Sequence, residues 1–115
     1  MLKRILLSLC CLFSGVGLAN QRAPEAWQWL EQGAVLIDVR TLEEFQQGHL
    51  EGATLIPYQQ IVAGAQQLGL KEDQAVVVYC RSGRRSGIAQ QLLEQAGFNK
   101  VHNGGGLQEM QLAQP

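Results

Sequence analysis

One cysteine stands among basic residues in a short segment that could carry out chemistry. The segment reads Cys80-Arg81-Ser82-Gly83-Arg84-Arg85, so three arginines and one glycine follow the thiol within five residues. Neighbouring cations favour the thiolate form of a cysteine, and the thiolate is the nucleophile. We therefore predict that Cys80 is a reactive nucleophile beside a binding site for a small anion.

The residues on either side of this segment would position the thiol. Residues 75–79, Ala-Val-Val-Val-Tyr, are typical of a strand buried on both faces of a parallel sheet. Ser86 is expected to begin a helix. In open α/β sheets, ligands bind beyond the carboxyl ends of the strands, which is where Cys80 would lie. Backbone N–H groups of a tight turn at Gly83 and of the helix start would bind the anion.

The rest of the chain alternates between strand and helix patterns. Further strands are expected at residues 34–37, 53–56 and 100–102, and helices at 24–32, 41–47, 58–68 and 107–112. Thr41 and Glu44 have the spacing of a capping box at the start of the second helix. This alternation predicts an α/β domain with a parallel sheet.

Length and composition exclude several classes of function. A chain of 115 residues fits one domain. The formal net charge is -1 and the basic residues form no stripe, so we expect neither nucleic acid nor an anionic membrane surface as a partner. Two histidines, His49 and His102, do not make a metal site, and His49 is expected to form a structural hydrogen bond.

The N-terminal residues have the pattern of a secretory signal peptide. Lys3 and Arg4 precede an uncharged stretch, residues 5–18, and small residues lead to a cleavage site after Ala19. We predict a signal peptide at 1–19 and a mature domain at 20–115 with a net charge of about -3. Cleavage would leave Cys80 as the only cysteine, without a disulfide partner. An uncleaved anchor and a lipoprotein are the alternatives.

Cysteine-dependent phosphatases are a rival class for such a loop. They place an arginine after five residues that follow the cysteine, and Ser86 occupies that position here. Arg85 comes one residue early, which implies a smaller loop. A smaller loop favours a single sulfur atom added to the thiol over a whole phosphate.

Four segments, in order, resemble the signatures of the rhodanese family. They are residues 37–45 with Ile-Asp-Val-Arg and Glu-Glu-Phe, residues 48–57 with Gly-His-Leu and Ile-Pro, residues 78–86 around Cys80, and residues 103–107, Asn-Gly-Gly-Gly-Leu. The resemblance is strongest to the small periplasmic members. It implies a three-layer rhodanese-like domain with a central parallel sheet of four to five strands and helices on both faces. The first strand of the family has little room after Ala19, and Met110 stands near the family's late tryptophan.

The resemblance also implies an activity, thiosulfate sulfurtransfer. Cys80 would take a sulfur atom from thiosulfate as a persulfide and pass it to cyanide or a thiol. The resemblance implies that this transfer needs no metal and no organic cofactor. The loop amides from Arg81 to Arg85, including Ser82 and Gly83, would hold the persulfide, and Arg81, Arg84 and Arg85 would bind the anionic donor. The protein would be a periplasmic monomer that does not contact the membrane after signal cleavage. The alternatives are a persulfide carrier with little turnover and a phosphatase or arsenate reductase.

Asp38 and Arg40 are interpreted as structural residues. An acid and a base two residues apart at the end of a strand can form an ion pair, for which Glu43 or Glu44 would be further partners.

Overall fold

The sheet is built from the apolar runs of the sequence. A computed structural model describes residues 21–115, so the predicted signal peptide, residues 1–19, lies outside the described part. Within it, the strands are β1 (Val35–Asp38), β2 (Thr54–Leu55), β3 (Val76–Cys80) and β4 (Val101–Gly106). All neighbouring strands are parallel and their order is β2-β1-β3-β4. The predicted parallel sheet is therefore confirmed, with four strands between residues 21 and 115.

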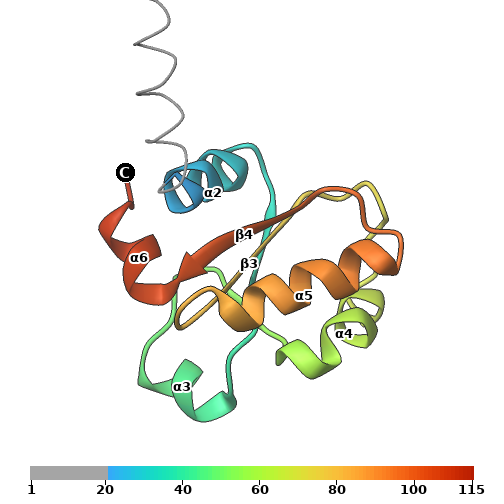
Figure 1. Ribbon diagram of the computed structural model, residues 1–115, viewed down its shortest axis with the longest axis horizontal. Coiled ribbons are helices and arrows are strands. Elements are labelled where there is room, and N and C mark those ends of the chain that lie inside the picture. The colour runs from blue at the N-terminus through green and yellow to red at the C-terminus, as the bar shows by residue number, and fades with distance from the viewer. Residues whose placement is uncertain (1–20) are drawn as a thin grey trace, which may run out of the picture.

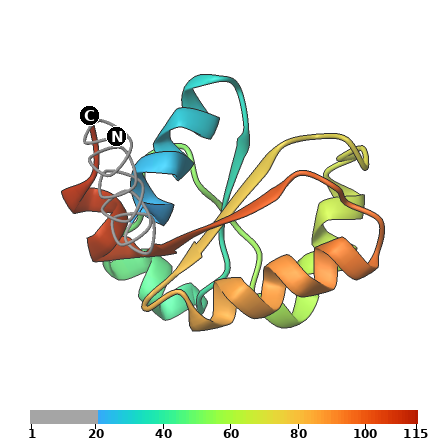
Figure 2. The same cartoon turned by 45° about the horizontal axis from the view of Figure 1, so that its top comes forward.

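Helices cover both faces of this sheet, as the family resemblance implied (Figure 1). The helices are α2 (Arg22–Glu31), α3 (Leu42–Gln47), α4 (Ile61–Gln67), α5 (Arg84–Gln95) and α6 (Leu107–Leu112), with a 3-10 turn, η1 (Tyr58–Gln60), before α4. Helices α2 and α6 pack on one face, and α4 and α5 pack on the other (Figure 2). None of the helices in residues 21–115 has the length and apolar character to cross a membrane.

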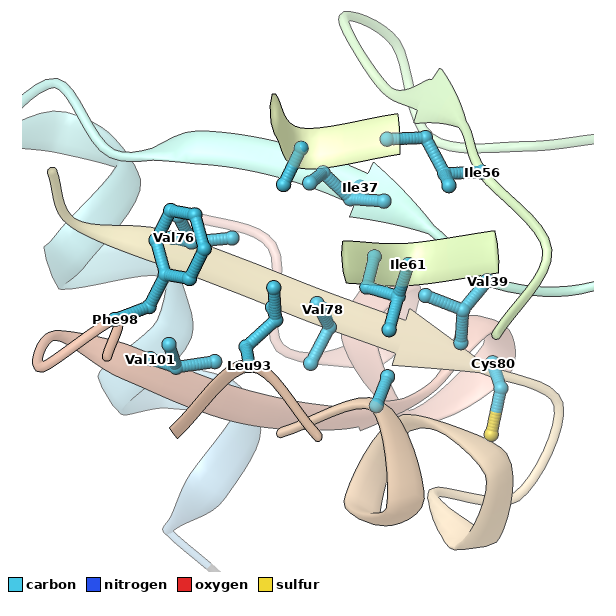
Figure 3. Close-up of a cluster of buried hydrophobic side chains, with 12 residues drawn as sticks. Ile37, Val39, Ile56, Ile61, Val76, Val78, Cys80, Leu93, Phe98 and Val101 are labelled. Atoms are coloured by element: carbon cyan, nitrogen blue, oxygen red, sulfur yellow. The ribbon is translucent and has the colours of Figure 1, made fainter. Parts of the chain in front are cut away.

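The core lies on both sides of β3 because alternate side chains of a strand point to opposite faces. Val76, Val78 and Cys80 face α4 and α5, where Leu93 is fully buried. Val77 and Tyr79 belong to the cluster under α2 and α6. Figure 3 shows the cluster under α4 and α5, with Cys80 at one end and its sulfur directed away from the other side chains.

Two element boundaries differ from the sequence prediction. Helix α5 begins at Arg84, two residues before the predicted start at Ser86, because Gly83 adopts φ 95° and serves as its N-cap. Strand β4 continues to Gly106, whereas the sequence pattern ended the strand at His102. A register shift lets β4 follow β3, so that Asn103 lies opposite Val78 and Gly105 opposite Tyr79.

The chain topology places a crevice at the carboxyl ends of β1 and β3. These strands are neighbours, but the chain leaves β1 for β2 on one side and leaves β3 for β4 on the other. Such a reversal of strand order is where open α/β sheets bind ligands. Asp38 ends β1 and Cys80 ends β3, so both residues lie at this edge.

Candidate active site

The thiol of Cys80 is enclosed by the turn that follows it. The residue is fully buried, and the backbone N–H of Gly83 donates a hydrogen bond to Sγ at 2.9 Å. The left-handed φ of 95° at Gly83 turns the chain from the strand into α5. The sulfur therefore faces the N-terminus of a twelve-residue helix, where free N–H groups and the helix dipole favour a negative charge.

Two opposing effects set the pKa of Cys80. Burial raises the pKa because it disfavours the charged thiolate. Hydrogen bonds from the hydroxyl and the amide of Ser86 and from the amides of Ser82 and Gly83 lower it, and together they outweigh burial. The pKa of the Cys80 thiol therefore lies below its ordinary value, which increases the fraction of reactive thiolate.

Ser86 connects the thiol to β4. Its Oγ lies 3.4 Å from Sγ of Cys80 and 2.7 Å from Oδ1 of Asn103. The side-chain amide of Asn103 donates to the carbonyl of Gly83 at 3.0 Å, and its Oδ1 also accepts the amide of Gly105 at 2.9 Å. A hydroxyl has one hydrogen to donate, so Ser86 can donate to Asn103 or turn that hydrogen to a negatively charged sulfur.

The structure divides the three predicted anion-binding arginines into two kinds. Arg81 and Arg84 are exposed next to the turn. Arg85 forms two hydrogen bonds with the carboxylate of Glu44 in α3, at 2.7 and 2.9 Å, so its charge is balanced. Arg85 is a link between α3 and α5 as well as a neighbour of the thiol.

The Asp38–Arg40 pair is confirmed, but neither Glu43 nor Glu44 forms the predicted ion pair with Arg40. Nε and Nη2 of Arg40 donate to the carboxylate of Asp38 at 3.0 and 2.7 Å, and Nη2 also donates to the carbonyl of Gly48 at 2.7 Å. Asp38 is fully buried, so it needs this partner. Glu44 pairs with Arg85 instead, because the capping box with Thr41 directs its carboxylate toward α5.

An open pocket of about 520 Å³ lies beside the Cys80 turn. Both charged and amide side chains line it: Arg40, Arg81, Glu44, Gln47, Gln108 and Gln111, together with Gly48 and Leu107. Cys80 itself does not line the pocket, and Arg81 is the residue that joins the pocket to the turn.

Sequence reasoning missed four residues that contact the turn or its neighbours. Ser86 and Asn103 bond around the thiol, Arg22 donates to the carbonyl of Ser82 at 3.1 Å, and Glu44 holds Arg85. Only Ser86 had a local signal, since it lies in the first turn of the helix after Cys80. The other three come from distant parts of the chain, which no local spacing reveals.

His49 makes the structural contact that we predicted. Its Nδ1 lies 2.8 Å from the carbonyl of Phe45, and its ring stacks on the ring of Phe45. Residues 21–115 contain no cluster of three or more His, Cys, Asp or Glu side chains that could hold a metal ion.

The arrangement is suited to nucleophilic chemistry on a small anion. A thiol with a lowered pKa supplies the nucleophile, and N–H groups of the turn are placed to stabilise a negative charge at its position. Gly106 allows β4 to approach this turn, because a Cβ at Gly106 would collide with the carbonyl oxygen of Arg81.

Comparisons with known proteins agree with this geometry. Residues 22–113 match the rhodanese-like domain family. The chain is 34% identical to the thiosulfate sulfurtransferase PspE of Escherichia coli K12 over 110 residues, which cover 96% of this chain and 93% of that protein. Among solved structures, an E. coli rhodanese with anions has a TM-score of 0.64 at 37% identity, with 72% of this chain and 95% of that chain covered. The human single-domain sulfurtransferase TSTD1 has a TM-score of 0.65 at 28% identity, with 80% and 93% covered.

Proposed function

The chain belongs to the rhodanese-like family, and we propose that it is a thiosulfate sulfurtransferase in which Sγ of Cys80 carries the transferred sulfur. The observation that carries this proposal is the enclosed thiol of Cys80, which has a lowered pKa and accepts the N–H of Gly83. Similarity over nearly the whole length of a thiosulfate sulfurtransferase supports the choice of substrate.

The first step transfers one sulfur atom to the protein. The thiolate of Cys80 attacks the outer sulfur of thiosulfate, so an S–S bond forms to Sγ while the S–S bond within thiosulfate breaks. The electron pair of the broken bond leaves with sulfite, and the negative charge moves to the terminal sulfur of a Cys80 persulfide. The amides of Ser82, Gly83 and Ser86, which lower the pKa of the thiol, stabilise this charge in the same way.

The second step returns the thiolate. A thiophile such as cyanide or a thiol attacks the terminal sulfur of the persulfide and forms the new bond to sulfur. The bond between that sulfur and Sγ then breaks, and its electron pair restores the Cys80 thiolate. Sulfur is exchanged between two nucleophiles, so the sequence needs neither an external oxidant nor a reductant.

The turn and the first residues of α5 bind the donor in this proposal. Ser82 and Gly83 supply backbone N–H groups, and the exposed guanidinium groups of Arg81 and Arg84 attract the dianion. Arg85 contributes less to the attraction of the donor because Glu44 neutralises its charge. Its role is to hold α3 against the start of α5. The open pocket next to Arg81 offers the donor and the acceptor a place to bind beside the turn that encloses the thiol.

The site offers little support for phosphatase chemistry. A phosphatase would use an arginine where Ser86 stands, and here the Ser86 hydroxyl lies 3.4 Å from Sγ. The carrier alternative uses the same persulfide and differs only in turnover, so an experiment must separate the two.

We also propose that the protein is exported and acts as a monomer. The charged residues Lys3 and Arg4, the uncharged stretch after them and the small residues before Asn20 support export. N-terminal sequencing of protein recovered from the periplasm would test the cleavage after Ala19.

The decisive experiment compares the protein with the variant Cys80→Ser. We expect thiocyanate formation from thiosulfate and cyanide to fall to background in the variant, and peptide mass spectrometry to show one added sulfur atom at Cys80 only in the unaltered protein. Lys71→Met, at an exposed position, is the control for general effects of substitution. Equal rates in the protein and Cys80→Ser would refute the proposal, and loading without turnover would favour the carrier.

A further inference from the structure

Arg22, at the start of α2, reaches across to the turn that encloses Cys80. Its Nη2 donates to the carbonyl oxygen of Ser82 at 3.1 Å. The guanidinium lies against Gly83, since a Cβ added there would stand 2.7 Å from both Nη atoms. Arg22 is thus in contact with the peptide unit between Ser82 and Gly83, although it lies sixty residues away in the chain.

That peptide unit carries the hydrogen bond to the thiol. In a trans peptide, the C=O and the N–H of the unit point in opposite directions, and no cis peptide occurs between residues 21 and 115. The oxygen of Ser82 points to Arg22, and the N–H of Gly83 in the same unit points to Sγ of Cys80 at 2.9 Å. A donor that holds the oxygen therefore also aims the N–H at the sulfur.

Two other elements hold Arg22, one through its guanidinium and one through its backbone carbonyl. Nε and Nη2 each donate to the carboxylate of Glu109 in α6 at 2.8 Å. Nε2 of His102 in β4 lies 2.7 Å from the carbonyl of Arg22, which holds the start of α2 in place. A bidentate pair with a carboxylate orients an arginine far better than a single contact does.

We propose that Arg22 is a positioning residue that clamps the Ser82–Gly83 peptide and so maintains the thiolate of Cys80. Two effects act in the same direction. The clamp keeps the Gly83 N–H on the sulfur, and donation to the Ser82 oxygen polarises the peptide, which strengthens the opposite N–H as a donor. The Arg22 side chain is 40% exposed, so water screens its charge and the main effect comes from the hydrogen bond.

This inference rests on the proposed role of Cys80, but its test does not depend on sulfur transfer. The full chain is alkylated with iodoacetamide over a range of pH, and peptide mass spectrometry measures the rate at Cys80 apart from Cys10 and Cys11. The proteins compared are the unaltered chain, Arg22→Met, which lacks the charge and the donors, and Lys71→Met, which removes one exposed positive charge elsewhere.

We expect Arg22→Met to move the midpoint of the Cys80 profile to higher pH and to lower the rate below the midpoint by about three- to tenfold. Lys71→Met should leave the midpoint unchanged. Should Arg22→Met fail to fold, Arg22→Leu, which also lacks a donor, is judged by the same shift. An unchanged midpoint in a folded Arg22 variant overturns the proposal, even where its melting temperature falls, because that result assigns Arg22 to packing alone. Loss of sulfur transfer without any shift would likewise overturn the clamp and leave the proposed function intact.

Discussion

At the scale of single residues, the reactivity of Cys80 depends on how many donors reach a buried sulfur. Full burial alone would keep the thiol protonated. Three residues, Ser82, Gly83 and Ser86, reverse that effect because their N–H groups, and the hydroxyl of Ser86, stabilise the thiolate. Each donor to a charged group contributes roughly 1.5–3 kcal/mol, so the loss of one should be measurable as a change in pKa.

Ser86→Ala should raise the pKa of Cys80, because it removes the hydroxyl donor and leaves the backbone amide. The midpoint of Cys80 alkylation should move to higher pH, and the rate at lower pH should fall about tenfold. As the pH is lowered, sulfur transfer by the unaltered protein should persist below the ordinary thiol pKa of about 8.5. The variant should lose its activity at a higher pH than the unaltered protein does, because its thiol becomes protonated earlier. Ser82→Ala is the control, since the Ser82 hydroxyl lies 3.5 Å from the amide of Arg84 and does not contact the sulfur. Equal shifts in both variants would contradict a specific role of the Ser86 hydroxyl.

At the scale of elements, pairs of side chains hold the helices around the turn. Glu44 is both the third residue of α3, where it completes the capping box with Thr41, and the partner of Arg85 in α5. The hydrogen bonds from Arg85, followed by those from Thr41, lower the pKa of Glu44 to about 2 despite its partial burial. The stability that this link provides should therefore depend on pH.

Glu44→Gln should lower the free energy of unfolding by about 1 kcal/mol near neutral pH. The folded-state pKa of Glu44 lies below its ordinary value of 4.5, so its contribution is complete above that value and is lost as the pH falls toward about 2. Urea unfolding at a series of pH values should show the difference between the variant and the unaltered protein shrinking over this range. Glu43→Gln, at the adjacent exposed position, should show no such convergence.

The contact between β4 and the Cys80 turn gives a second prediction about elements. Gly106 has an ordinary backbone conformation, φ -96° and ψ 162°, so alanine would not strain its backbone. Its Cβ would instead collide with the carbonyl of Arg81. Gly106→Ala should therefore displace the turn, lower sulfur transfer by about a hundredfold, and reduce the free energy of unfolding by about 1–3 kcal/mol.

The matched control for this substitution is Gly87→Ala. A Cβ at Gly87 would meet only the amide nitrogen of Asn103, at an ordinary 3.5 Å, and a glycine inside a helix costs about 0.5–1 kcal/mol relative to alanine. Gly87→Ala should therefore be at least as stable as the unaltered protein and remain active. Full activity in Gly106→Ala would show that the close approach of β4 does not position the turn.

At the scale of the whole molecule, the sequence predicts what is local and misses what is distant. The apolar run before Cys80 predicts β3 because burial on both faces leaves a direct mark on composition. The spacing of Thr41 and Glu44 likewise predicts their capping box. The contacts of Arg22 with Glu109 and of Glu44 with Arg85 join residues 87 and 41 positions apart. Only the fold brings such residues together, so no spacing could predict them.

The difference between local patterns and distant contacts also explains why the boundaries of α5 and β4 differ from the sequence prediction. The early start of α5 depends on the left-handed conformation of Gly83, and the long β4 depends on its pairing with β3, which absorbs a register shift. Met110 stands near the place where the family often has a tryptophan. Its side chain is fully buried, and its carbonyl accepts the indole N–H of Trp27 at 2.8 Å. The departure from the family pattern is therefore accommodated in the core under α2 and α6.

The two clusters should unfold together, because β1 and β3 each contribute buried side chains to both. Leu93 and Met110 are each fully buried, one on each face. Leu93→Ala and Met110→Ala should each cost about 2–5 kcal/mol, and the double variant should lose the sum within about 0.5 kcal/mol, since the sheet separates the sites. Leu112→Ala, at a position that is 83% exposed, should change little.

Two probes can follow the faces separately during denaturant unfolding. Fluorescence of Trp27 and Trp29 reports on α2, and amide hydrogen exchange in α5 reports on the opposite face of the sheet. We expect coincident transitions in each single variant, because a domain of this size has one cooperative core. If Leu93→Ala let the amides of α5 exchange before the tryptophan signal changed, the α5 side would be a separate unit, and the clamp from Arg22 could not by itself keep the thiol enclosed.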